Sequence, residues 1–239
     1  MIKKHSILLI LLLLSFGFPE IIISSSASYY FRTLGINDGL SQSTVNAILQ
    51  DRKGFMWIGT KDGLNQYDGQ ECRVFQKENS SLGNNFITAL YEDCEGYIWV
   101  GTDAGVYIYN PVQEAFQFLD TEIAASGEKI TRAVTWITSD SQNNIWISVD
   151  NQGLFCYNRG KKNLTKVVSC GESGIANVTH FWFYAGQLWI ARYEDNLYVS
   201  KDNSSFNAFN DVDGEDIFKG LVINSYVDLK SATIIQYTI

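Results

Sequence analysis

The chain has 239 residues, of which 18 are Lys or Arg and 26 are Asp or Glu, so its formal net charge is −8. This acidic balance, with no basic cluster beyond the first residues, argues against a nucleic-acid-binding protein, because phosphate recognition needs positive charge. Hydrophobic residues make up 46% of the chain and aromatic residues 14%, with two prolines. This composition favours short strands rich in Tyr, Trp, Ile and Val over helical bundles.

The first 27 residues differ in kind from the rest. Lys3 and Lys4 precede an apolar run over residues 7–14, and the small residues of 24–27 follow it. A basic start, a short apolar segment and small residues before a cleavage point predict a secretory signal peptide over residues 1–27. The unbroken apolar run is short for a bilayer span. An uncleaved anchor that also uses residues 21–23 is the alternative, and it would be the chain's contact with the membrane.

An internal repeat is centred on four tryptophans, Trp57, Trp99, Trp146 and Trp189, spaced by 42, 47 and 43 residues. In the first two copies an aspartate stands six residues before Trp and a glycine three before it, Gly-Thr stands two and three residues after Trp, and a tyrosine comes ten residues after it. The repeated positions before the tryptophans are Asp51, Gly54, Asp93, Gly96 and Asp140. The third copy has Asn143 in place of the glycine. A fifth copy begins at Val222 and has Ile234 in the tryptophan position.

Each repeat predicts four short antiparallel strands. An apolar strand comes first, and the Asp-x-x-Gly sequence that follows it indicates a tight hairpin, because the carboxylate accepts local backbone N–H groups and glycine adopts positive φ. The tryptophan strand, a third strand and a fourth strand follow. Four strands in about 44 residues are typical of a β-propeller blade.

We therefore predict an all-β fold: an incomplete propeller of about four and a half blades over residues 28–239, arranged as an open arc. The flanks of its end blades would expose apolar surface and open strand edges, and would promote self-association. A helical solenoid of similar period is the alternative, but glycine recurs too often for its helices.

The candidate metal and thiol sites are few. The four cysteines (Cys72, Cys94, Cys156 and Cys170) have no metal-ligand spacing, and all but Cys170 fall inside expected strands, which favours free, buried thiols over disulfides. Residues 211–216 resemble half a calcium loop but lack its final glutamate. His180 is expected to be an ordinary strand residue. We expect no metal and no cofactor.

The stretch Asp38–Val45, followed by Gln50–Gly69, resembles the opening of the two-component regulator propeller family. The resemblance covers residues 30 to about 239 and is most specific in the first two repeats. It implies the periplasmic sensor region of Bacteroides-type hybrid two-component histidine kinases, several of which sense oligosaccharides. Because the chain ends before any kinase region, we expect a non-enzymatic N-terminal fragment whose partners are an oligosaccharide and the remainder of the sensor.

The candidate ligand-binding residues follow from position in the fold. In a propeller, the connections between second and third strands share one face with the loops between blades. The residues expected there are Lys61, Asp62, Asp103, Arg192, Tyr193 and Glu194. For each of them, a plain solvated loop is the alternative.

Two other functions stay open. One is a free-standing periplasmic binding or scaffold propeller. The other is a secreted propeller enzyme, although the sequence has no nucleophile elbow, phosphate loop or histidine cluster.

Overall fold

A computed structural model describes residues 31–122, 127–169, 178–184, 186–192, 197–200, 207–208, 224–228 and 233–237. The expected signal peptide lies outside the described residues. The chain divides into a unit of residues 1–33 and a unit of residues 34–239, and all of the sheets belong to the second. Within the described part of the chain, no helix is both long enough and apolar enough to cross a membrane.

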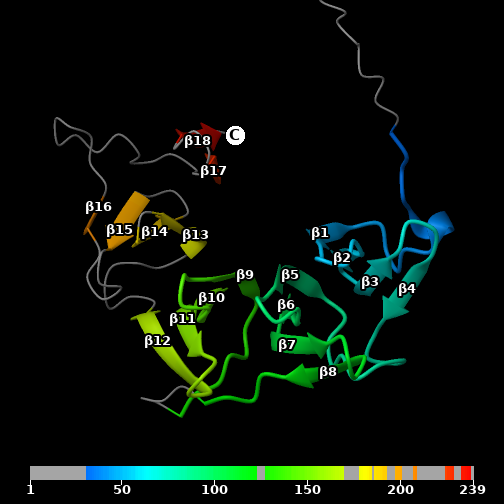
Figure 1. Ribbon diagram of the computed structural model, residues 1–239, viewed down its shortest axis with the longest axis horizontal. Helices are drawn as coiled ribbons and strands as arrows, with labels where there is room; N and C mark the ends of the chain where they lie inside the picture. The colour runs from blue at the N-terminus through cyan, green and yellow to red at the C-terminus, as the bar shows by residue number, and fades with distance from the viewer. Residues whose placement is uncertain are drawn as a thin grey trace, which may run out of the picture. The chain divides into compact units, whose positions relative to one another are not determined.

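Four sheets of four antiparallel strands follow one another along the chain (Figure 1). Blade 1 consists of β1 (Val45–Gln50), β2 (Met56–Thr60), β3 (Gly63–Tyr67) and β4 (Cys72–Phe75). Blade 2 consists of β5 (Ile87–Glu92), β6 (Ile98–Thr102), β7 (Gly105–Asn110) and β8 (Ala115–Phe118). Blade 3 consists of β9 (Val134–Ser139), β10 (Ile145–Val149), β11 (Gly153–Asn158) and β12 (Asn163–Ser169).

Blade 4 consists of β13 (Val178–Tyr184), β14 (Gln187–Arg192), β15 (Leu197–Ser200) and β16 (Asn207–Ala208). A further antiparallel pair, β17 (Asn224–Asp228) and β18 (Thr233–Tyr237), follows it. A short 3-10 helix, η1 (Ile36–Asp38), precedes blade 1. Four antiparallel strands per repeat confirm the predicted all-β propeller architecture.

The hairpin between the first and second strands has the backbone that its sequence predicts. Gly54 and Gly96 have φ values of 94° and 87°, in the left-handed region that glycine adopts without strain. Asn143, at the same position of blade 3, has a φ of 61°. Asparagine tolerates this region better than most residues, which explains why it can replace glycine there.

The hydrophobic core lies between successive blades. The first strands contact one another in series, β1 with β5, β5 with β9 and β9 with β13. The second-strand tryptophans of blades 1 and 2 pack on a tyrosine of the next blade: the ring centroids of Trp57 and Tyr109 are 5.0 Å apart, and those of Trp99 and Tyr157 are 5.6 Å apart. Burial of these large rings is the main attraction between neighbouring blades.

The glycine two residues after tryptophan makes room for the next blade. Ile87, at the start of β5, lies against Gly59, where a Cβ atom would be 2.5 Å from its Cγ2. Val134, at the start of β9, lies against Gly101 in the same way, with a corresponding distance of 2.7 Å. Ile87 and Val134 are fully buried. This close approach explains the glycine, and we call it the knob-and-hole contact.

The first strand of blade 1 corresponds to the strands that carry the knob in blades 2 and 3, but no blade packs against it in the described residues. Val45 and Ile48 of β1 are 39% and 63% exposed, whereas Ile87, which corresponds to Val45 in blade 2, is fully buried. Among the described strands, β1 has no comparably extensive contact with β13 or β17, so the blades form an open arc, as predicted. Self-association through this flank stays a prediction.

Replacing Gly59 or Gly101 by alanine is expected to lower the free energy of unfolding by about 1–3 kcal/mol, because the new methyl group would overlap the knob of the next blade. Urea unfolding of the full chain, followed by tryptophan fluorescence, measures the change. Gly160→Ala is the matched control, since the nearest atom to its Cβ would be 3.6 Å away. Equal effects at all three glycines would contradict the knob-and-hole contact.

Candidate functional site

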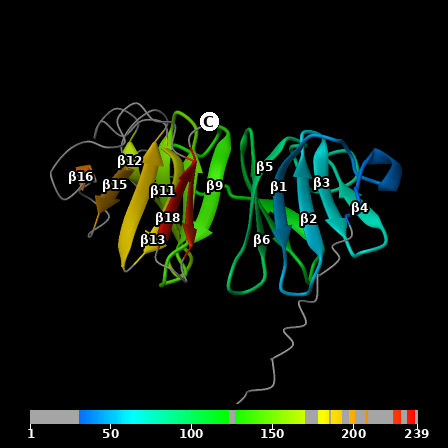
Figure 2. The same ribbon diagram turned by 90° about the horizontal axis from the view of Figure 1, so that it is seen from above.

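The strands of each blade end at two faces, which Figure 2 shows as the two edges of the upright sheets. The first face carries the turns between first and second strands and those between third and fourth strands. The second face carries the turns between second and third strands together with the loops that join the blades. We call them the clamp face and the loop face.

On the clamp face, the repeated aspartate binds both its own turn and the tryptophan. Asp51 Oδ1 accepts hydrogen bonds from the backbone N–H groups of Lys53 and Phe55, each at 2.9 Å. Its Oδ2 accepts one from Trp57 Nε1 at 2.8 Å. A single carboxylate thus shapes the hairpin and fixes the orientation of the indole in the core between the blades. We call this arrangement the Asp–Trp clamp.

The clamp recurs in the next two blades. Asp93 binds Trp99 Nε1 at 2.8 Å, and Asp140 binds Trp146 Nε1 at 2.9 Å, while each also accepts two backbone N–H groups of its turn. Sequence reasoning found the role in the turn and missed the bond to the indole. The signal was present in the constant spacing of six residues between aspartate and tryptophan.

Charged side chains of the clamp face also join blade 1 to blade 2. Arg52 Nε lies 2.7 Å from Glu92 Oε1, and the Arg52 backbone N–H donates to the other oxygen of the same carboxylate at 2.9 Å. Arg73 Nη1 lies 2.8 Å from Glu114 Oε2. One contact runs from the β1–β2 turn to the end of β5, and the other from β4 to the β7–β8 turn.

Blade 3 reaches back to blade 2 through Arg159. Its Nη1 lies 2.9 Å from Asp93 Oδ2 and its Nη2 lies 2.6 Å from Glu95 Oε2. The Asp93 side chain is 1% exposed, so this ion pair is largely shielded from water. Asp93 therefore serves its own turn, the indole of Trp99 and the neighbouring blade.

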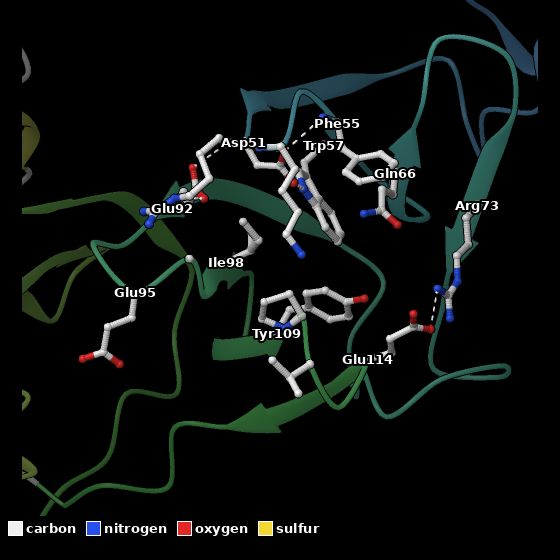
Figure 3. Close-up of a pocket in the computed structure, with 15 residues that line it drawn as sticks. Asp51, Phe55, Trp57, Gln66, Arg73, Glu92, Glu95, Ile98, Tyr109 and Glu114 are labelled. Atoms are coloured by element: carbon white, nitrogen blue, oxygen red, sulfur yellow. Dashed lines mark hydrogen bonds and ion pairs between the residues drawn. The ribbon is translucent and has the colours of Figure 1, made fainter.

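A groove of about 400 Å³ runs between blades 1 and 2 on the clamp face (Figure 3). Trp57 and Tyr109 line it but are only 1% and 3% exposed, so they present little ring surface to a ligand. The Arg73–Glu114 ion pair lies at one end of the groove, where Figure 3 marks it by a dashed line. The aromatic rings are buried and these charges are paired, so the groove serves blade packing.

On the loop face, the structure gathers three of the predicted ligand residues around the loop between blades 1 and 2. Asp62 Oδ1 accepts a hydrogen bond from Asn85 Nδ2 at 3.1 Å. Lys61 Nζ lies 6.0 Å from the ring centroid of Phe86, and the Asp103 N–H donates to the Phe86 carbonyl at 3.2 Å. The β2–β3 turn, the loop and the β6–β7 turn therefore form one continuous surface.

Two of these three side chains have no polar partner in the described part of the chain. Both the Lys61 ammonium and the Asp103 carboxylate belong to exposed residues, and neither makes a hydrogen bond or ion pair with a described side chain. Charged groups that hold nothing in the fold are free to bind a ligand. The clamp face differs, because Asp93 and Arg159 there are used in joining blades.

The other predicted ligand residues cannot be placed beside them. Arg192 is the last residue of β14, and its side chain lies outside the described residues, as do Tyr193 and Glu194. The acidic stretch of residues 211–216 lies outside them too.

His180 lies in β13, in the strand context expected for it. Its ring meets Trp136 edge-on, with centroids 5.1 Å apart. Burial lowers the pKa of His180, so the imidazole is neutral at pH 7.

Within the described ranges, no three His, Cys, Asp or Glu side chains are grouped in a way that could hold a metal ion.

The cysteines only partly follow the sequence prediction. Cys72 and Cys156 lie in β4 and β11, and both are free and half-buried. The prediction of a buried strand position was wrong for Cys94, which is exposed in the β5–β6 turn. Strand β5 ends at Glu92 because Asp93 closes the turn through its backbone bonds. Cys170 lies outside the described residues.

Comparison with known families identifies the repeat. The sequence model of the two-component regulator propeller family matches residues 39–62 and 81–104. Each match spans the first two strands of a blade, including the Asp–Trp clamp and the glycine of the knob-and-hole contact. The predicted family of these repeats is thereby confirmed.

The chain is similar to a histidine kinase and to extracellular domains of two-component systems. The chain is 40% identical over 53 residues to histidine kinase P4 of Formosa agariphila, a match that covers 22% of this chain and 4% of the kinase. The extracellular domain of a hybrid two-component system of B. thetaiotaomicron has a TM-score of 0.66 at 24% identity, with 89% of this chain and 32% of that chain covered. A second such domain from the same organism has a TM-score of 0.66 at 20% identity, with 82% and 26% covered.

At these identities, the solved structures establish the fold alone. The chain spans about a third of the first of these extracellular domains and about a quarter of the second.

Asp93→Asn is expected to lower the free energy of unfolding by about 1–2 kcal/mol more than Asp51→Asn does. Both changes place an amide where the indole N–H needs an acceptor, but only Asp93 also pairs with Arg159. Urea unfolding of both variants measures the difference. Arg159→Gln in each background is the control: it should erase the difference between them, and a difference that persisted would contradict the role of this ion pair.

Thiol alkylation is expected to distinguish the cysteines. Cys94 is exposed and should react with a maleimide at pH 8 in the folded chain. Burial raises the pKa of Cys156 to about 11, so at pH 8 this thiol stays protonated and should react far more slowly, speeding up only as the pH approaches 11. Peptide mass spectrometry gives both rates, and urea-unfolded chain is the control in which the two rates should converge.

Proposed function

We propose that this chain, whose first two blades are two-component regulator propeller repeats, forms part of the extracytoplasmic ligand-sensing region of a two-component signal-transduction sensor. Its ligand is an oligosaccharide, and the loop face binds it. The chain itself carries no enzymatic activity in this proposal. It acts through the remainder of the sensor, on the outer side of the cytoplasmic membrane.

The observation that carries the proposal is the different use of charge on the two faces. Asp93 and Arg159 on the clamp face hold turns and blades together. On the loop face, Lys61 and Asp103 are exposed and hold no described side chain. Blade packing thus accounts for Asp93 and Arg159 on the clamp face and leaves Lys61 and Asp103 on the loop face for a ligand.

The chemistry of the loop face suits a ligand with many hydroxyl groups. Asp103 supplies an acceptor and Lys61 a donor. Asn85 holds the loop beside them, because its Nδ2 donates to Asp62 Oδ1 and to Glu78 Oε2 at 3.2 Å and its Oδ1 accepts from the Lys77 N–H. A surface that is already ordered binds with a smaller loss of conformational entropy. An oligosaccharide presents donors and acceptors along its length and fits a shallow surface that crosses two blades.

The names of the relatives support signalling over the other two functions. The matched kinase and the two extracellular domains are all named as parts of signalling systems. No described contact specifically favours a free-standing scaffold propeller or a propeller enzyme.

Binding to the loop face can be tested with one pair of matched variants. Asp103→Ala is expected to weaken oligosaccharide binding by about tenfold, because one charge-assisted hydrogen bond is lost. Glu71→Ala is the control, since it also removes one exposed carboxylate but lies in the β3–β4 turn of the clamp face. A glycan array identifies the ligand, and isothermal titration calorimetry with the full chain measures its affinity.

Equal loss of affinity in both variants would place the ligand away from the loop face. Turnover of any bound oligosaccharide would contradict the non-enzymatic part of the proposal. An array without a single bound glycan would remove the sensing function itself.

A further inference from the structure

A second hollow on the loop face lies at blade 3. Its volume is about 430 Å³. The loop between blades 2 and 3 contributes Lys129 and Arg132 to its lining, the β10–β11 turn contributes Gln152, and β12 contributes Lys166. The Asp150 N–H donates to the Ala133 carbonyl at 2.8 Å and holds this turn against the loop.

The hollow is basic in an otherwise acidic protein. Three cationic side chains line it, against one carboxylate, Glu128, in a chain of net charge −8. Lys129 forms an ion pair with Asp120, which raises the pKa of Lys129 and keeps its ammonium charged. Arg132 is exposed and forms no ion pair with a described residue.

Lys166 adds a second cation whose charge no described carboxylate balances. Its Nζ lies 5.9 Å from the ring centroid of Phe155, which positions the side chain without neutralising it. The guanidinium of Arg132 is planar and has paired donors that match a carboxylate or a sulfate. Both groups line the same hollow.

Gln152 supplies the polar part of the hollow. Its Nε2 donates to the Lys129 carbonyl at 2.8 Å, which fixes the orientation of the amide. Its Oε1 is buried and accepts no hydrogen bond from a described residue. A buried acceptor without a donor is costly, and a hydroxyl group of a ligand in the hollow would satisfy it.

We propose that this hollow is the subsite for the acidic group of an acidic oligosaccharide. The carboxylate or sulfate of the sugar binds Arg132 and Lys166, and a neighbouring hydroxyl donates to Gln152 Oε1. This inference rests on the proposed function and narrows its ligand to oligosaccharides that carry negative charge. The neutral part of the sugar chain then extends over the loop face.

The test uses calorimetry on the full chain with three probes: trigalacturonate for a carboxylate, a chondroitin sulfate tetrasaccharide for a sulfate, and neutral galactotriose. At least one acidic probe should bind, and more tightly than galactotriose, and its affinity should fall with added salt. Arg132→Gln and Lys166→Gln should each weaken the binding of that probe by about tenfold. Arg132→Lys keeps the charge but loses the paired donors and should bind with intermediate affinity.

Lys161→Gln is the matched control, because Lys161 is an exposed lysine in the β11–β12 turn of the clamp face. It removes the same charge and should leave the affinity unchanged. Thermal unfolding of each variant confirms that the fold is retained, and Arg132→Lys keeps the test decisive if a glutamine variant fails to fold.

The failures of the two proposals are distinguishable. Binding of galactotriose with an affinity that Arg132→Gln does not change would leave the sensing function intact and overturn the acidic subsite. Acidic probes that bind all variants equally would overturn the subsite as well. Absence of binding by all three probes and by a wider glycan array would overturn both.

Discussion

The structure depends on one steric constraint, the insertion of the first residue of blades 2 and 3 into a gap in the blade before it. Ile87 and Val134 fill the space that Gly59 and Gly101 leave open. Because the first strand of one blade comes so close to the second strand of the blade before it, only one register between the blades is possible. A shift by one residue would put a side chain where the gap is. This close approach of the backbones is required both for the aromatic packing of Trp57 on Tyr109 and for the ion pairs between blades on the clamp face.

The knob-and-hole contact and the Asp–Trp clamp have separate roles in the first two repeats, which contain both. The contact sets the distance between blades, and the clamp fixes the ring that fills the remaining space. Because both sit in the first two strands, this half of the repeat is strongly constrained. The turn between second and third strands carries neither, and its side chains vary from Lys61 and Asp62 in blade 1 to Asp103 and Ala104 in blade 2. Recognition of a ligand is therefore free to differ from blade to blade while the fold stays the same.

The sequence was sufficient to predict the fold because the same pattern of residues recurs in successive repeats. Tryptophan, aspartate and glycine at fixed spacings predicted the strands, the hairpins and the family of the first two repeats. The indole bond of Asp51 was missed, because a turn alone already explained the aspartate. Cys94 was misplaced, because the hydrogen bonds of Asp93 end the strand earlier than its apolar pattern suggests.

The candidate site was less accessible from sequence. Position in the repeat sufficed to place Lys61, Asp62 and Asp103 on the loop face, since the turn between second and third strands falls at the same place in each of the first blades; their role in ligand binding stays a prediction. Nothing in the sequence brought Arg132 and Lys166 together, because one lies in a loop between blades and the other in an outer strand. The unsatisfied oxygen of Gln152 depends on the three-dimensional course of that loop and has no pattern along the chain.

The ion pairs of the clamp face give the arc an uneven stiffness. Blade 2 receives Arg52 and Arg73 from one neighbour and Arg159 from the other, so it is tied on both sides, whereas β1 of blade 1 has an open flank. In a row of repeats that are stabilised by their nearest neighbours, local unfolding starts at the repeat that makes the fewest interactions with its neighbours. Blade 2 is therefore held more rigidly than blade 1.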